Sequence, residues 1–189
     1  MVGTRPTKCA RRMLSALPAS LQLIVVVLLV LATQGWASSA QVMMDPSTAV
    51  ILGLGRQAVT RIQVSGVEDL FGYQLELHYD PSVVHAEDLE LGDFISSDWV
   101  LEDHIDNADG VVVVGVSQRN PTPPRDGSGV LVGIRWKGVS PGTTDLALSE
   151  VKLAKPGGER IPVDVRSGQI EVVQQEDLQY TFLPMVVGE

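Results

Sequence analysis

The chain has 189 residues, 44% of them hydrophobic, with 14 basic and 23 acidic residues and a formal net charge of −9. Four basic residues and no acidic ones precede Gln41, so the remainder carries 10 − 23 = −13. This acidic balance argues against nucleic acid or an anionic lipid surface as partner, since both require a basic patch. For about 150 residues after a leader, one domain is the natural expectation.

The first forty residues have the order of regions that the secretion machinery requires. A basic start precedes ten consecutive apolar residues, Leu23–Ala32, and small residues follow as far as Ala40. The apolar run is shorter than the roughly 20 residues of a membrane span. We predict a signal peptide over 1–40, cleaved before Gln41, and a secreted or cell-surface protein with no membrane span after cleavage. An uncleaved anchor is the alternative.

Beyond the leader, short apolar stretches alternate with turn residues. In Tyr73–Tyr79 every second residue is apolar, which is typical of a strand with one side in a core and the other in water. Asp80-Pro81 ends this strand, because proline has no N–H for a sheet ladder. The predicted strands are 42–54 with an interruption at Asp45-Pro46, 59–64, 73–79, 83–91, 99–105, 111–116, 130–136, 146–153, 161–165 and 169–173.

Short strands at this spacing predict an all-β fold, an antiparallel two-sheet β-sandwich of about nine strands. We expect a turn at Gly66–Asp69 and a loop over Asn120–Gly129, where glycine and proline concentrate. The segment Pro81–Asp88 is the one place compatible with a helical turn. Residues 174–189 are expected to form an acidic linker and a short apolar C-terminal tail, Tyr180–Val187.

Four segments, in this order and spacing, resemble a cohesin domain: Gly66-Val67, Gly72–Val84, Gly129–Trp136 and Gly168–Val172. The resemblance covers most of 41–173, which we take as one cohesin-like domain. It implies a jelly-roll sandwich that binds a dockerin module through one flat sheet face. It also implies that calcium belongs to the dockerin, so that this chain needs no cofactor and binds no metal.

The resemblance also implies which residues contact the partner. By position these are Gly72, Gln74, Glu76, His78, Val111, Val113, Gly115 and Gln118. The best-studied cohesins carry asparagine and aspartate where Gly72 and Gln74 stand, so this chain departs from that residue pattern.

The residues themselves point to the same surface. Alternation puts Gln74, Glu76 and His78 on the wet side of their strand. If the even-numbered valines of 111–116 face the core, then Val111 and Val113 lie outside. An apolar strip rimmed by polar groups is typical of a partner interface. A covering loop is the alternative.

Metal and catalytic sites are weaker interpretations. The run Asp106–Gly110 suggests calcium, but an EF-hand loop needs an acid at its first position and glutamate at its twelfth, where Ile105 and Val116 stand. A plain hairpin turn suffices. Glu76 and His78 could form an acid–base pair, but a flat sheet face offers no cleft to shift a pKa. We therefore expect no enzyme.

The most favoured function is a secreted, non-catalytic, monomeric module that docks a dockerin-bearing protein, in an extracellular assembly or a polysaccharide-degrading complex. A carbohydrate-binding module is the alternative, because Trp99 and Trp136 could stack on sugar rings. Trp136 follows Ile134 in an alternating strand, which predicts that its side chain points inward. A structural spacer domain on a cell surface is the third possibility.

Overall fold

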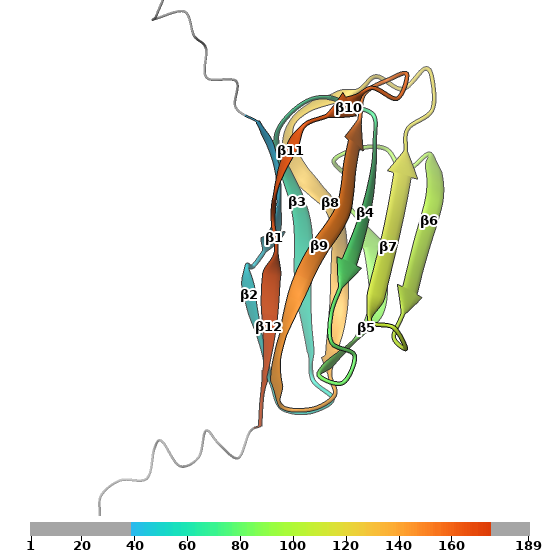
Figure 1. The fold of residues 1–189 in the computed structure, drawn as a ribbon. Helices are drawn as coiled ribbons and strands as arrows, with labels where there is room; N and C mark the ends of the chain where they lie inside the picture. The colour runs from blue at the N-terminus through green and yellow to red at the C-terminus, as the bar shows by residue number, and fades with distance from the viewer. Residues whose placement is uncertain (1–38, 175–189) are drawn as a thin grey trace, which may run out of the picture. The chain divides into compact units, whose positions relative to one another are not determined.

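A computed structural model describes residues 39–174 of the chain, and every element in that range is a strand. Figure 1 shows them packed as two layers. The strands are β1 (Ala40–Asp45), β2 (Thr48–Leu52), β3 (Gln57–Leu70), β4 (Gly72–His78), β5 (Val84–Leu91), β6 (Trp99–Asp106), β7 (Val111–Ser117), β8 (Arg125–Gly138), β9 (Gly142–Ala154), β10 (Arg160–Ile161), β11 (Val163–Arg166) and β12 (Gly168–Val173).

The two layers are sheets of different width. One has the order β11-β1-β3-β8-β5, and the other has the order β2-β12-β9-β4-β7-β6, with β10 paired to β9. Most pairings are antiparallel, as predicted, but β1 pairs with β11 and β2 with β12 in parallel. The predicted interruption at Asp45-Pro46 explains this arrangement. There the chain passes from one sheet to the other, so that β1 and β2 each pair with a strand near the end of the domain.

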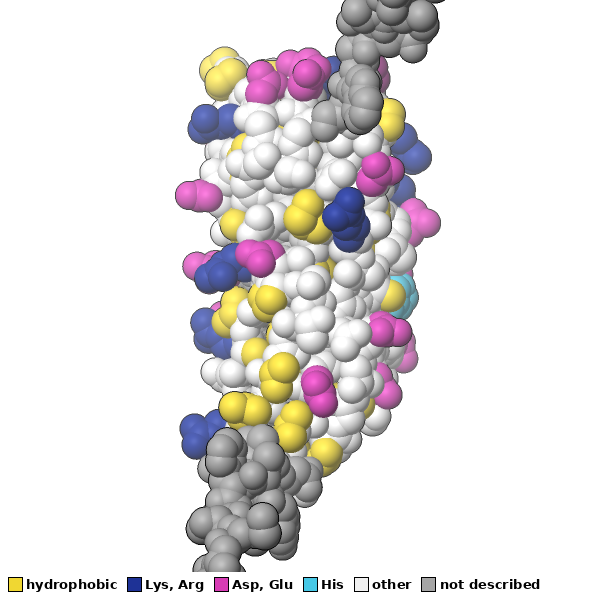
Figure 2. Space-filling model, turned by 90° about the vertical axis from the view of Figure 1, so that its left-hand side faces the viewer, with side chains coloured by type: hydrophobic (Ala, Val, Ile, Leu, Met, Phe, Trp, Pro, Cys, Tyr) yellow, Lys and Arg dark blue, Asp and Glu magenta, His cyan; other side chains and the backbone are white. Residues whose placement is uncertain are grey.

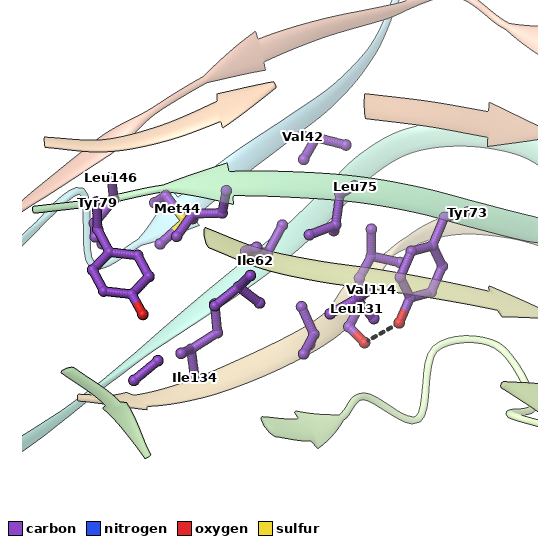
Figure 3. Packing of buried hydrophobic residues seen from close by; sticks show 14 of the residues in the cluster. Val42, Met44, Ile62, Tyr73, Leu75, Tyr79, Val114, Leu131, Ile134 and Leu146 are labelled. Atoms are coloured by element: carbon purple, nitrogen blue, oxygen red, sulfur yellow. Dashed lines mark hydrogen bonds between the residues drawn. The ribbon is translucent and has the colours of Figure 1, made fainter. Parts of the chain in front are cut away.

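The core lies between the sheets and follows the predicted alternation. On β4, Tyr73, Leu75 and Leu77 are buried, while Gln74 and His78 are exposed. Figure 3 shows Leu75 and Val114 of one sheet facing Ile62 and Ile134 of the other. This burial of apolar side chains is the main favourable contribution to folding.

Trp136 points inward, as predicted, and is fully buried. Its indole N–H donates to the Thr60 hydroxyl at 2.8 Å. The Tyr79 ring meets the indole edge to face, with centroids 5.0 Å apart and planes at 75°. The carbohydrate-binding alternative therefore depends on Trp99 among the described residues.

Asn107 connects the turn after β6 to the opposite sheet. Its side-chain amide donates to Ala86 O at 2.9 Å, and its side-chain oxygen accepts from Ala86 N at 2.9 Å. The same oxygen accepts from the Tyr79 hydroxyl at 2.7 Å. One side chain thus satisfies both backbone groups of a buried residue, as a ladder partner would.

Two local predictions need correction. Gly66–Asp69 is not a turn, because β3 continues through it and pairs Val67 with Gly127 and Leu70 with Arg125. Its positive-φ residues shift the register without ending the strand. Because this part of β3 pairs with β8, β8 begins at Arg125, inside the loop expected over Asn120–Gly129. Pro81–Val83 is a turn that leads into β5, and it contains the single helical turn that was expected, because Asp80 O accepts from Val83 N at 3.1 Å and from Val84 N at 3.2 Å.

The predicted leader and the predicted linker and tail lie outside the described residues, apart from Ser39, Ala40 and Gln174. β1 begins at Ala40, one residue before the predicted cleavage point. Ala40 is buried and pairs with Val163, and the Ser39 hydroxyl donates to the Asp164 carboxylate at 2.6 Å. Within residues 39–174 there is no helix of the length and hydropathy that crossing a membrane requires.

Candidate functional site

The residues that the sequence singled out on β4 and β7 lie side by side, because these strands are adjacent and antiparallel. Gln74 is opposite Gly115, Glu76 is opposite Val113, and His78 is opposite Val111. In Figure 1 both strands lie toward the edge of the sheet that ends at β6.

The neighbouring strands extend this surface on both sides, β9 beyond β4 and β6 beyond β7. Residues paired across a ladder project to the same side of a sheet, so the register defines four rows. The rows are Ala147–His78–Val111–Asp106, Ser149–Glu76–Val113–His104, Lys152–Gln74–Gly115–Glu102 and Ala154–Gly72–Ser117–Trp99. We call this surface the β4–β7 face. Strand spacing makes it about 14 Å wide and about 20 Å long.

The centre of the β4–β7 face is apolar. Val111 and Val113 are half-buried, and no side chain rises from Gly115. A Cβ placed on Gly115 would lie 3.5 Å from the Cβ of Leu101, which is 58% exposed. The apolar strip therefore continues from β7 onto β6.

Trp99 stands at one corner of the face. It is 51% exposed, and the Arg119 guanidinium lies 5.2 Å from its ring centroid. This distance is that of a cation–π contact, which holds the indole in place while leaving much of it accessible.

Polar groups border the strip. Glu76 Oε1 and His78 Nε2 are 2.6 Å apart, with side chains 33% and 47% exposed. Lys152 Nζ lies 2.8 Å from Glu150 Oε2. These groups can donate and accept hydrogen bonds at the rim. A cavity of about 300 Å³, lined by Arg61, Glu90 and Gly133, lies on the other sheet, and one of about 260 Å³, lined by Lys152, Arg160 and Pro162, adjoins the β9 side of the face.

The outer face of the five-stranded sheet has a different character, because its charges pair with one another. Arg135 lies 3.7 Å from Asp88, Lys137 lies 3.3 Å from Glu87, and the Gln57 amide also donates to Glu87. Such cross-strand pairs are typical of a solvated surface. The apolar strip therefore distinguishes the β4–β7 face.

One predicted site residue is misplaced. Gln118 is 2% exposed and does not lie on the β4–β7 face. Its side-chain amide donates to Pro123 O at 3.2 Å and to Leu70 O at 3.4 Å, and its side-chain oxygen accepts from Ser96 N at 3.3 Å. The period of two that buries Val114 and Val116 also turns residue 118 inward.

Ser117 takes the outward position that was assigned to Gln118, opposite Gly72. A Cβ on Gly72 would lie 3.1 Å from Val116 O and 3.3 Å from the Ser117 hydroxyl oxygen. There is little space for a side chain at position 72. At Gly72 the face therefore presents backbone only.

Sequence reasoning missed the contribution of β6. Trp99 to His104 are all exposed, because β6 is the edge strand and neither of its sides is fully covered. The period of two in Glu102, His104 and Asp106 could have indicated that these three side chains share a face.

The run Asp106–Gly110 forms the predicted hairpin turn between β6 and β7. The Asp106 carboxylate accepts from Ala108 N at 2.8 Å and from Asp109 N at 3.1 Å. Backbone hydrogen bonds from Asp109 and Ala108 hold the pKa of this carboxyl below its usual range. Among residues 39–174, no three His, Cys, Asp or Glu side chains gather as ligands for a metal.

Comparison with solved structures confirms the fold. A non-cellulosomal cohesin from the archaeon Archaeoglobus fulgidus superimposes with a TM-score of 0.60 at 16% identity, over 78% of this chain and 100% of that one. The third cohesin of ScaC from Acetivibrio cellulolyticus was solved with the ScaB dockerin. It superimposes with a TM-score of 0.62 at 16% identity, over 71% of this chain and 99% of that one.

A type I complex of Clostridium thermocellum, Coh-OlpC with Doc435, gives a TM-score of 0.62 at 13% identity, over 72% of this chain and 94% of that one. No protein-family model and no curated protein matches the sequence. The resemblance to cohesins and the all-β jelly-roll sandwich are thus confirmed at the level of the fold.

Proposed function

We propose that the chain is a secreted, non-catalytic binding module that docks a dockerin-bearing protein on its β4–β7 face. Two solved proteins that share its fold were captured with dockerins bound, which supports this class of partner. Because the identities are only 13–16%, the choice of face depends on this chain's own residues.

One observation carries the proposal, the apolar strip of Val111, Val113 and Leu101 within a rim of hydrogen-bonding groups. A fully desolvated apolar centre with a polar rim is the arrangement that gives protein interfaces most of their binding energy. The face is about 14 Å wide, which suits a partner helix of roughly 10–12 Å diameter lying along the strands.

The absence of a cleft at Glu76 and His78 favours binding over catalysis. A general base requires a substrate held within hydrogen-bonding distance, and an exposed pair on a flat face provides no such enclosure. We assign calcium to the partner, as the resemblance to cohesins implies. The acidic turn after β6 uses its Asp106 carboxylate to accept hydrogen bonds from its own backbone.

The test is capture from the culture fluid of the organism that encodes the chain. Immobilised protein should retain one dockerin-bearing protein in calcium and release it in a chelator. Val113→Asp should abolish capture, since a charge at the apolar centre removes a contact worth about 2 kcal/mol or more if Val113 is a hot spot.

Val59→Asp is the matched control. Val59 lies on β3, is 42% exposed and faces solvent on the opposite sheet, beside Arg135. It should leave both folding and capture unchanged. Equal capture by Val113→Asp and Val59→Asp would refute the placement on the β4–β7 face.

A carbohydrate-binding module remains the second candidate, favoured by the exposed indole of Trp99. It predicts retention on an insoluble polysaccharide and loss of that retention in Trp99→Ala. A docking module predicts that the polysaccharide retains neither the parent protein nor Trp99→Ala.

A further inference from the structure

A second apolar surface lies at the other edge of the same sheet. On β2, Ala49 and Ile51 face the core, while Val50 is 49% and Leu52 54% exposed. Leu54, in the turn that follows, is 50% exposed. We call Val50, Leu52 and Leu54 the β2 patch. Figure 2 shows hydrophobic side chains gathered on this side of the molecule.

The β2 patch is not part of the β4–β7 face. β2 is the edge strand on the far side of β12 and β9 from β4. A free edge with exposed apolar side chains invites association, and proteins usually cover or charge such an edge. Among residues 39–174, β12 is the strand bonded to β2, so its other edge is unpaired in that part of the chain.

The described chain leaves the sandwich beside this patch. Val173, the last residue of β12, pairs with Leu52, and Gly53 N donates to Val173 O at 2.9 Å. Residues 174–179 are mostly polar, and the segment Tyr180–Val187 is apolar except for Thr181. Six residues span at most about 20 Å, whereas two residues of a strand span about 7 Å, so the whole patch lies within reach.

We propose that Tyr180–Val187 packs its apolar side chains on the β2 patch and covers the edge of the sheet. The short tether favours this segment over a second copy or a separate partner, because a linked segment is present at an effective concentration in the millimolar range. This inference is independent of the docking proposal, since the two surfaces share no residue.

Cysteine trapping in the full chain tests the proposal. With Cys9, the chain's one cysteine, changed to serine, Leu52→Cys is combined with Phe182→Cys. The matched control combines Leu101→Cys with Phe182→Cys, because Leu101 is 58% exposed on β6 at the opposite edge. Peptide masses after digestion without reductant identify the disulfides. We expect the Leu52 pair to form its intramolecular disulfide at least about tenfold faster than the Leu101 pair.

Equal rates for the two pairs would overturn the proposal, as would disulfides that form only between chains. Hydrogen exchange of 48–52 in the cysteine-free chain gives a second readout. Phe182→Ser with Leu183→Ser should accelerate exchange there at every protein concentration. Exchange that is unchanged by these substitutions, or protection that disappears on dilution and so indicates a second copy, would also overturn it.

Discussion

The Tyr73 hydroxyl donates a hydrogen bond to Leu131 O at 2.7 Å, across the space between the two sheets. Leu131 is the residue that the β3–β8 ladder skips, since Ile62 pairs with Val132 and Gln63 with Val130. Its carbonyl accepts from Gly92 N and also from this side chain of the opposite sheet. Tyr73 lies between Gly72 and Gln74, so this bond fixes the strand that carries the β4–β7 face.

Tyr73→Phe removes this bond and nothing else from the core. Leu131 O also accepts from Gly92 N at 2.8 Å, so the carbonyl keeps a partner. We expect the free energy of unfolding to fall by about 1 kcal/mol, measured by chemical denaturation. Burial raises the pKa of the Tyr73 phenol, so the donor should persist at alkaline pH. A variant as stable as the parent would contradict a structural role for this bond.

Gln118→Ala tests the corrected role of that residue. The substitution leaves Leu70 O without this partner in a buried place, and Ser96 N and Pro123 O without it in partly buried places. We expect a loss of about 2–4 kcal/mol in the free energy of unfolding. The neighbouring Ser117→Ala should change it by no more than about 0.5 kcal/mol. Loss of partner binding in a Gln118→Ala protein that is fully folded would instead restore the original assignment to the face.

The sequence predicted the part of the site that depends on one strand at a time. The alternation in Tyr73–Tyr79 identifies the buried and exposed sides of β4. The valines of β7 follow the same logic, because two strands of one sheet with matched periods place their outward residues in common rows.

The features of the site that the sequence did not predict depend on contacts between residues far apart in the chain. Nothing in the sequence near Gln118 or Asn107 shows that their amides bond to Ser96 or Ala86, which belong to other elements. The position of β6 at the sheet edge likewise depends on the order of strands. That order explains why Leu101 is exposed although it belongs to an apolar run.

Asp106 should make the domain sensitive to acid. Hydrogen bonds from Asp109 N and Ala108 N lower its pKa, so its contribution to stability is present above the ordinary carboxyl range and is lost as pH falls through the lowered value. Hydrogen bonds from Ser82 lower the pKa of Asp80, and a hydrogen bond from Ser96 lowers that of Asp98. Both carboxylates therefore also stabilise the domain above the ordinary carboxyl range.

Asp106→Asn keeps an oxygen acceptor in the turn but removes the titrating group. We expect its melting temperature to decline less than that of the parent between about pH 5 and pH 2. Asp109→Asn removes a neighbouring carboxylate without removing either hydrogen bond, and should follow the parent. If the melting temperatures of Asp106→Asn and the parent decline equally as the pH falls, this carboxylate contributes nothing to acid unfolding.

Glu76→Gln separates binding from stability at the rim of the β4–β7 face. The contact between Glu76 and His78 is partly exposed, and such contacts contribute at most about 1 kcal/mol, so the free energy of unfolding should change by no more than about 1 kcal/mol. The dissociation constant for the captured partner should rise about fivefold, chiefly through slower association, and depend less on salt. Surface binding kinetics at two ionic strengths measure both effects.

Glu90→Gln, on the outer face of the opposite sheet beside Gly133, is the control and should bind as the parent does. If Glu90→Gln weakens binding as much as Glu76→Gln, the effect comes from net charge and the rim assignment is wrong.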